Sequence, residues 1–424
     1  MRFAMAQSPK STRRGALAAA GLAIAGCGPR AGDPRLLSEA PLRVQPAPTP
    51  TPAVFPPVRF PQDEGPHDVL AEWWYYTGHL YPGASGHGPG ARGGEATAGE
   101  AEEEYGFELV FFRGVRGSRP PGYAAHFAIT DLPRRRFHYD QRVDVALNEP
   151  AAPGPAAGAA VGQRLAAGGG VEAEAGGSRP PGTVALVPPG GGFDLALGGW
   201  QIRGRDGSDS LAAAMPDYRL EVALTAQRPP ALHLGDPPLQ PGLIGFGPAG
   251  YSYYYSRTRM AVTGTLEVDG RPLPVYGDAW MDHQWGDFLV LGGGGWDWFA
   301  GTLRDGRDLT LSLVRDAAGA TILAYGTLVN PSGEARHLPS VDFGVEPLGI
   351  WSSPHTGIRY PSGWRVRLPG ERLDTLWLPL LEDQELDARA SSGVVYWEGA
   401  VAVLDAASRA ELGRGYVELT GYAA

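Results

Sequence analysis

Short runs of alternating apolar and polar residues, bounded by Gly, Pro and Asp, dominate this chain from Phe60 onward. Successive side chains of a β-strand point to opposite faces, so this alternation predicts strands, and the period of an amphipathic helix is almost absent. Many short strands separated by turn residues are typical of sandwiches and barrels. The chain is therefore predicted to be all-β. The clearest strands are 72–80, 106–113, 124–130, 218–225, 257–268, 296–303, 308–314, 321–328, 364–368, 394–404 and 415–420.

The chain of 424 residues is long enough for two or three domains. We place a boundary at the hairpin turn 266–272, which divides the body into domains 60–268 and 269–424. Two Gly- and Ala-rich stretches, 82–104 and 151–192, interrupt the first half. Because they can bury little apolar area, we interpret them as surface insertions without a fixed shape.

Composition excludes several chemistries. The net charge of −10 argues against a nucleic-acid partner. The only lysine, Lys10, and the only cysteine, Cys27, lie in the first thirty residues, ahead of the predicted folded body. A lysine Schiff base, a P-loop, a cysteine nucleophile, a disulfide and a thiolate zinc site are therefore excluded. We predict no cofactor and no metal.

The first residues are predicted to be an export signal. Arg13 and Arg14 precede a short apolar run that ends at Cys27, and residues 24–27 resemble the processing box of bacterial lipoproteins, in which the cysteine is lipidated. A proline-rich linker, 28–59, follows. We therefore expect a signal peptide over 1–27 and an exported lipoprotein of the cell envelope, anchored to a membrane through Cys27. An uncleaved or cytoplasmic tail is the alternative.

The segment 72–80 has large aromatic residues on both faces of its predicted strand. Glu72, Trp74 and Tyr76 share one face, whereas Trp73 and Tyr75 share the other. A strand of this kind is covered on both sides. Burial beside aromatic rings raises the pKa of a carboxyl unless it is paired, so Glu72 is either a candidate acid or one half of a buried salt bridge.

A second cluster follows at 276–287. If this segment is a strand, Trp280 and Asp282 point to one face, whereas His283 and Trp285 point to the other. A histidine in apolar surroundings is neutral near pH 7 and can serve as an acid or base. The commoner fate of such a residue is a structural histidine bonded to a carbonyl group. The density of tryptophans and carboxylates here favours a ligand or catalytic site, which extends to Trp296 and Trp298.

Four ordered motifs resemble the lipocalin-like family that unites bacterial predicted secreted hydrolases with carotenoid 1,2-hydratases (hydroxyneurosporene synthases). The motifs lie at 72–75, 280–286, 296–299 and, at the C-terminal end, 396–401 with 415–422. The resemblance implies two consecutive lipocalin-like antiparallel β-barrel domains. In the hydratases a histidine and a tryptophan spaced H-x-W, and a tyrosine and an aspartate spaced Y-x-D, are implicated in hydration. His283 and Trp285 match the first pair, but the strand 308–314 lacks the second.

These observations support three hypotheses. In the first, a hydro-lyase related to the carotenoid hydratases, Asp282 or Glu72 protonates an alkene, aromatic rings shield the cation and His283 takes the proton from water. In the second, a non-catalytic barrel carries an apolar small molecule. In the third, the protein is an envelope scaffold or assembly partner. A hydrolase of unknown substrate is a further alternative. The predicted ligand-binding residues are Trp74, Tyr76, Trp280, Trp285, Trp296 and Trp298.

Overall fold

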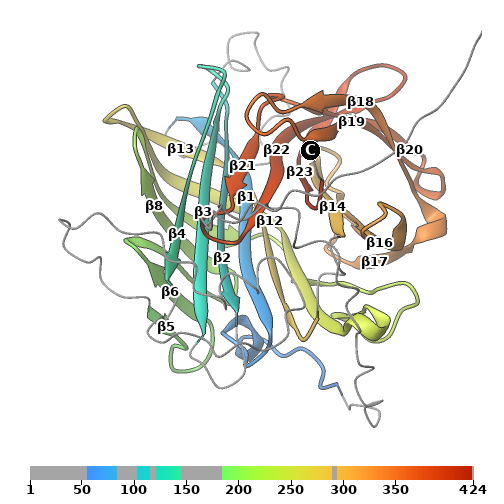
Figure 1. Ribbon diagram of the computed structural model, residues 1–424, viewed down its shortest axis with the longest axis horizontal. Coiled ribbons are helices and arrows are strands. Elements are labelled where there is room, and N and C mark those ends of the chain that lie inside the picture. The colour runs from blue at the N-terminus through green and yellow to red at the C-terminus, as the bar shows by residue number, and fades with distance from the viewer. Residues whose placement is uncertain (1–54, 84–102, 115–120, 145–183, 289–293, 423–424) are drawn as a thin grey trace, which may run out of the picture. The chain divides into compact units, whose positions relative to one another are not determined.

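The computed structural model describes residues 55–83, 103–114, 121–144, 184–288 and 294–422. These residues all belong to one compact unit, Pro48–Ala424. They are nearly all β-structure, arranged in two antiparallel sheets that curl into barrel-like domains (Figure 1). The predicted all-β fold with two lipocalin-like barrels is confirmed. The signal peptide with Cys27, the linker up to residue 54 and most of both Gly/Ala-rich stretches lie outside the described residues.

The first sheet has thirteen strands in the order β4-β3-β2-β1-β13-β12-β9-β8-β7-β6-β5, with β10 and β11 paired to β12. Two short 3-10 helices, η2 (Gln62–Glu64) and η3 (Gly247–Ala249), lie in its connections. The strands are β1 (Ala71–Pro82), β2 (Tyr105–Gly114), β3 (Gly122–Asp131), β4 (Arg136–Asp144), β5 (Val184–Leu186), β6 (Phe193–Leu197), β7 (Trp200–Arg205), β8 (Ser208–Met215), β9 (Tyr218–Ala226), β10 (Ala231–Leu232), β11 (Leu243–Gly245), β12 (Tyr251–Val268) and β13 (Arg271–Gly286).

The second sheet has ten strands in the order β17-β16-β15-β14-β23-β22-β20-β19-β18, with β21 paired to β22. The 3-10 helices η4 (Ser340–Asp342) and η5 (Pro369–Glu371) lie in its connections. The strands are β14 (Gly295–Leu303), β15 (Asp308–Arg315), β16 (Thr321–Val329), β17 (Ala335–Pro339), β18 (Gly344–Ser352), β19 (Arg359–Leu368), β20 (Leu373–Pro379), β21 (Glu385–Ala388), β22 (Val394–Asp405) and β23 (Glu411–Leu419).

The turn between β12 and β13 is the place where we expected a domain boundary. Asp269 and Gly270 have φ angles of 49° and 74°, the paired positive values of the tight hairpin turns that Asp-Gly sequences favour. Such a turn returns the chain into the same sheet, and β13 accordingly lies between β12 and β1. The second sheet begins only with β14 at Gly295, so β13 belongs to the first sheet.

The strands next to the second sheet are buried on both faces. Along β9 burial alternates, as expected where one face meets water, but every residue of β3 is buried and β1 is buried almost throughout. One face of β1 contributes Trp74 and Tyr76 to the core of the first barrel, and the other contributes Tyr75 to a cluster shared with the second sheet. Both segments that we singled out therefore lie where the two sheets meet.

Hydrogen bonds join the two sheets directly. Tyr75 donates to Glu398 on β22 at 2.6 Å, and Thr130 on β3 donates to Gln384 at 2.7 Å. Glu104, which we placed at the end of a surface insertion, is instead buried, because it pairs with His79 and Arg414 at 2.8 Å each. The end of the other stretch, 151–192, forms β5.

None of the helices in the described ranges is long and apolar enough to cross a membrane.

Candidate functional site

Both sequence clusters meet at the centre of the first sheet, where β1 pairs with β13. In this antiparallel register Trp74 lies opposite His283, and Tyr75 lies opposite Asp282. Because side chains alternate along each strand, the pairs point to opposite faces of the sheet. The predicted residues therefore divide between two places, one inside the first barrel and one between the two sheets.

On the barrel side, Glu72 joins His283 to a second histidine, His67. A carboxylate only accepts hydrogen bonds, so both histidines donate to its Oε1 atom: His67 through Nδ1 at 2.7 Å and His283 through Nε2 at 2.9 Å. The other oxygen accepts the backbone N–H of His67 at 2.9 Å. Arg113 Nη1 lies 3.7 Å from that second oxygen. Glu72 is therefore paired with neighbouring groups, which agrees with the interpretation of Glu72 as one half of a buried salt bridge.

Burial and pairing set the charges of this group. Burial raises the pKa of Glu72, but hydrogen bonds from His283 and His67 outweigh it, so the pKa lies below its ordinary value. Burial lowers the pKa of His283 to about 4. Burial also lowers the pKa of His67, but its hydrogen bonds to Asp63 and Glu72 raise it above the ordinary value. At neutral pH Glu72 is therefore an anion and His283 is neutral.

Aromatic rings enclose this group. The rings of Trp74 and His283 stack with centroids 4.6 Å apart, and Trp285 stacks on His67 at 4.3 Å. The Nδ1 atom of His283 is buried and has no hydrogen-bond partner in the part of the chain that the structure describes. Within the described residues, His67, Glu72 and His283 form the one group of potential ligands whose donor atoms all lie within 4.8 Å of one another.

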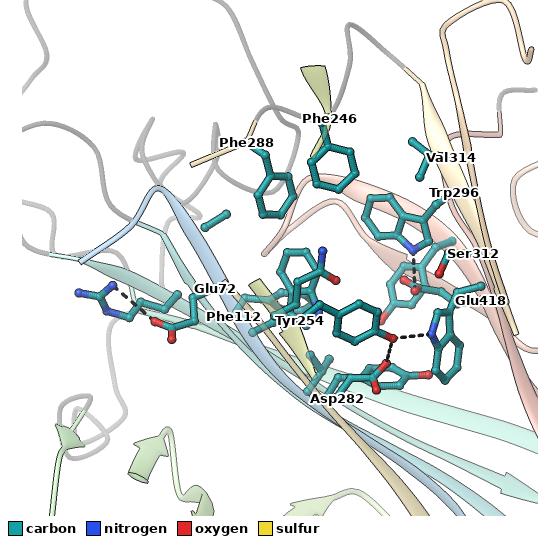
Figure 2. Close-up of a pocket in the computed structure, with 18 of the residues that line it drawn as sticks. Glu72, Phe112, Phe246, Tyr254, Asp282, Phe288, Trp296, Ser312, Val314 and Glu418 are labelled. Carbon is teal, nitrogen blue, oxygen red and sulfur yellow. Dashed lines mark hydrogen bonds and ion pairs between the residues drawn. The ribbon is translucent and has the colours of Figure 1, made fainter. Parts of the chain in front are cut away.

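On the opposite face of β13, a cavity of about 120 Å³ lies between the two sheets. Figure 2 shows its labelled residues, with Glu72 at one end, apart from Asp282 and Glu418. Most of its wall is apolar and aromatic, and strands of both sheets contribute to it. The aromatic residues that line it are Trp73, Tyr75, Phe112, Phe246, Tyr254, Phe288, Trp296, Trp298, Tyr325 and Tyr396.

Asp282 lines this cavity and has only neutral hydrogen-bond donors as partners. Tyr254 donates to Oδ2 at 2.6 Å, and Trp280 Nε1 donates to Oδ1 at 2.6 Å. The hydroxyl of Ser256 also donates to Oδ1. Trp298 in turn donates to the hydroxyl of Tyr254 at 3.0 Å (Figure 2). Burial outweighs these hydrogen bonds and raises the pKa of Asp282 to about 7. A substantial share of this carboxyl is protonated at neutral pH.

Besides Glu72 at one end, two further carboxyls line the same cavity. Burial raises the pKa of Glu418 to about 7, although Trp296 donates to it at 2.7 Å. Burial raises the pKa of Glu108 to about 8, with the hydroxyl of Tyr396 donating at 2.9 Å. Oε2 of Glu108 is buried and has no hydrogen-bond partner among the described residues. The cavity thus combines an apolar wall with weakly acidic groups that can hold a proton near pH 7, which suits proton transfer to an apolar molecule.

The predicted aromatic residues divide in the same way. Trp74, Tyr76 and Trp285 are core residues of the first barrel, where the Tyr76 hydroxyl donates to Asp209 at 2.9 Å. Trp296 and Trp298 line the cavity, and Trp280 lies beside it, bonded to Asp282. Of the three predicted catalytic residues, Glu72 and His283 touch each other, whereas His283 does not reach the cavity that Asp282 lines.

Sequence reasoning missed His67, Tyr254, Glu108 and Glu418. In the alternating run 251–255, Tyr254 points away from Tyr253 and Tyr255, and this pattern could have assigned it to the face of Asp282. Glu418 lies within the C-terminal motif that carried the family resemblance. His67 and Glu108 are marked by no local pattern, because only the folded chain brings them to these places.

Comparison with known proteins agrees with this architecture. A crystal structure of a Nitrosomonas europaea protein described as an AttH protein superposes with a TM-score of 0.64 at 29% identity, covering 88% of this chain and 99% of that one. Kievitone hydratase from Nectria haematococca superposes with a TM-score of 0.55 at 16% identity, covering 86% and 93%, so it shares the fold. A search of curated protein sequences finds no match.

A family profile described as AttH-like matches residues 51–422, which include every described residue of both sheets. The match spans the two motifs at the centre of the first sheet and the C-terminal motif on β22 and β23. The chain therefore belongs to the AttH-like family.

Proposed function

We propose that this protein adds water across a carbon–carbon double bond at the end of an apolar, isoprenoid-like substrate held between the two sheets. The observation that carries this proposal is Asp282, a buried carboxyl with only neutral donors around it that faces a cavity with aromatic walls. The fold shared with kievitone hydratase and the motifs shared with carotenoid hydratases support the same reaction class.

The size of the cavity suggests which part of a substrate enters it. A dry cavity of about 150 Å³ is known to hold benzene, and the cavity here has about 120 Å³. One isoprene-sized group fits such a space, whereas a long polyene does not fit in full. We therefore expect the end of a substrate to occupy the cavity, which suits chemistry at a terminal double bond.

The reaction needs a proton donor and protection of a cation. The Asp282 carboxyl gives its proton to one alkene carbon, and the π electron pair forms the new C–H bond. The other carbon becomes a tertiary cation, which aromatic faces such as those of Trp296 and Trp298 stabilise by about 0.5–2 kcal/mol each. A water oxygen then bonds to this carbon, and its surplus proton returns to the Asp282 carboxylate. The acid is regenerated, and the net change is the addition of one water.

His283 takes no part in this scheme, which differs from our first hypothesis. That hypothesis paired Asp282 as acid with His283 as base, but the two side chains leave opposite faces of β13. The hydration chemistry is retained, and Asp282 itself takes back the proton from water, so that the scheme needs no second base.

The second candidate function is a carrier for an apolar molecule without chemistry. The aromatic wall of the cavity favours it, since such a wall binds apolar ligands whether or not a proton moves. The two functions make different predictions for Asp282, because a carrier does not need its proton. One substitution therefore separates them.

The test is product formation by the full chain in detergent from neurosporene- and lycopene-type polyenes and shorter prenyl chains, in oxygen-labelled water. We expect one labelled oxygen in the product and a loss of at least ~100-fold in turnover for Asp282→Asn. Asp209→Asn is the matched control, because burial also raises the pKa of Asp209 to about 7, but that residue lies inside the first barrel.

Full activity of Asp282→Asn would refute the catalytic role. If no substrate in the panel gains water, yet the prenyl chains bind equally well to the parent and to Asp282→Asn, the carrier function is supported instead. Mass spectrometry of the bound fraction distinguishes the two results, because a catalyst releases hydrated molecules and a carrier returns its ligand unchanged.

We also propose that the protein is exported and anchored to a membrane through a lipid on Cys27. The support is in the sequence: paired arginines, a short apolar run and a lipoprotein-like box ending at Cys27. Mass spectrometry of the N-terminal peptide from native membranes tests this. A diacylglyceryl group on Cys27 is expected, and an unmodified Met1 N-terminus on the membrane-free protein would contradict it.

A further inference from the structure

The group formed by His67, Glu72 and His283 has no role in the proposed hydration. It lies on the barrel side of β13, where His283 faces away from the cavity of Asp282. Three chain segments supply it: the loop after η2, strand β1 and strand β13. Two imidazole nitrogens are directed at the same carboxylate oxygen, Oε1 of Glu72, at 2.7 and 2.9 Å.

This donor set is one that metal ions use. Two histidines and one glutamate bind zinc in several enzymes, with metal–ligand distances of about 2.0–2.2 Å. Around a tetrahedral ion, ligand atoms at those distances lie about 3.3 Å apart. The two hydrogen-bonded pairs would need to open by about half an ångström to admit an ion between them, and His67, on a loop, can move. The binding of the ion would release the protons that now fill these hydrogen bonds.

The surroundings support metal binding as well. Ligating histidines usually donate their other ring nitrogen to a carboxylate or carbonyl, and Nε2 of His67 lies 3.5 Å from Oδ1 of Asp63. Oε2 of Glu72 is engaged by the backbone N–H of His67, so that Oε1 is the oxygen presented to both imidazoles. The positive charge of Arg113 lies 3.7 Å from Oε2, whereas both ring nitrogens contact Oε1.

We propose that His67, Glu72 and His283 bind a divalent transition-metal ion, with Zn²⁺ the ion whose preferences best match two imidazoles and one carboxylate. The ligand atoms are Nδ1 of His67, Oε1 of Glu72 and Nε2 of His283, and water supplies the remaining position. The ion fastens the loop after η2 to the two central strands of the first sheet. The ion site lies on the barrel side of β13, and of its three ligands only Glu72 also borders the cavity, at the end away from Asp282.

The test is zinc binding by the full chain, purified without a polyhistidine tag. Every sample carries Cys27→Ser, because the single thiol of the chain would bind zinc itself. Calorimetric titration with Zn²⁺, followed by metal analysis after gel filtration, should give one ion per chain. Thermal unfolding should shift to higher temperature as Zn²⁺ is added, because the ion binds only the folded site.

His67→Asn is the decisive variant, because its amide nitrogen can still donate to Glu72 but is a poor zinc ligand. His67 is partly exposed, so the fold should tolerate the change. We expect zinc affinity to fall by at least ~100-fold in His67→Asn, and equally in Glu72→Gln. His355→Asn is the matched control, since His355 also contacts a carboxylate, Asp383 at 2.8 Å, but belongs to no group of three such ligands among the described residues.

Each outcome decides the matter. Absence of one-to-one binding in the parent chain would show that the group is only a hydrogen-bonded triad. Binding that is equally tight in His67→Asn would place the ion elsewhere. Should His67→Asn fail to fold, the visible absorption of bound Co²⁺ in the parent chain reports whether nitrogen ligands hold the ion in a site of low coordination number. A spectrum of hexahydrated Co²⁺ would overturn the proposal.

Discussion

Asp282 and His283 are consecutive residues of β13, yet they face different surroundings. The carboxyl of Asp282 lines the cavity between the two sheets, whereas the imidazole of His283 packs between Trp74 and Glu72 in the first barrel. Both side chains are almost completely buried. A sheet only one chain thick therefore separates two polar groups with different chemistry, and substitutions of the two residues should have independent effects.

Asp282 should make the protein less stable as the pH rises. Its pKa is about 7 in the folded chain against an ordinary value of 3.8. Between these values the unfolded chain releases the proton while the folded chain retains it, so the free energy of unfolding falls with rising pH. One carboxyl contributes a slope of about 1.4 kcal/mol per pH unit. Asp282→Asn should remove this slope between about pH 4 and pH 7.

Urea unfolding of the parent and the variant at several pH values measures the difference. Glu221→Gln is the control, because the side chain of Glu221 is mostly exposed on the outer face of β9. Parallel curves for the parent and Asp282→Asn across this range would mean that Asp282 is ionised in the folded protein, and the acid role would then be lost.

Tyr254→Phe should raise the pKa of Asp282 further. The Tyr254 hydroxyl donates to the carboxyl at 2.6 Å and thereby favours its charged form. Without this hydrogen bond the pKa of Asp282 rises, so hydration should persist to higher pH than in the parent. The variant also loses a buried hydrogen bond and about 1–3 kcal/mol of stability. The measurement is the pH dependence of the hydration rate. If activity is lost at a lower pH in the variant than in the parent, the role of Asp282 as the acid is contradicted.

Substituting an aromatic residue of the cavity should weaken ligand binding, whereas substituting one that packs against the core of the second barrel should not. Trp296 lines the cavity, whereas Trp351 is similarly half-buried but packs against the core of the second barrel. Trp296→Leu should weaken the binding of a prenyl alcohol by about tenfold, equivalent to about 1.4 kcal/mol. Trp351→Leu should leave the affinity unchanged. Calorimetry with the prenyl alcohol checks both, and equal affinities in all three proteins would place the ligand elsewhere.

The strands, unlike the pairing between them, could be predicted from the sequence. Alternation over 72–80 and 257–268 is a local property, and both segments are strands in β1 and β12. The neighbour of β1, however, is β13, some two hundred residues later, and no local pattern encodes that pairing. For the same reason the turn at Asp269 and Gly270 marked a hairpin and not the boundary between the two sheets.

The candidate site was predictable to a similar extent. Alternation already assigned Asp282 and His283 to different faces, and the structure has them so. Their partners depend on long-range contacts: His67 reaches Glu72 from a loop, and Glu418 reaches the cavity from β23. A carboxylate in a loop or strand looks the same in sequence whether it is solvated or buried, so the cluster of acids could not be foreseen.

Glu104 should make the junction of the two sheets sensitive to acid. It comes just before β2, and its carboxylate accepts hydrogen bonds from Arg414 on β23 and from His79 on β1. Burial raises the pKa of Glu104, but these partners outweigh it and lower the pKa from 4.5 to about 2. Glu104 therefore stabilises the protein above pH 4.5, and this stability is lost as the pH falls towards 2.

Glu104→Gln should remove this contribution at neutral pH. It leaves the Arg414 guanidinium near an uncharged amide, and breaking a buried ion pair in this way costs about 3–5 kcal/mol. The loss should shrink on acidification, because the parent then loses the same charge. Glu411, which also contacts Arg414 but is more exposed, supplies the matched variant Glu411→Gln with a cost below about 1 kcal/mol. Urea unfolding at pH 7 and at pH 3 measures both, and equal costs for the two variants would show that Glu104 does not fasten the sheets together.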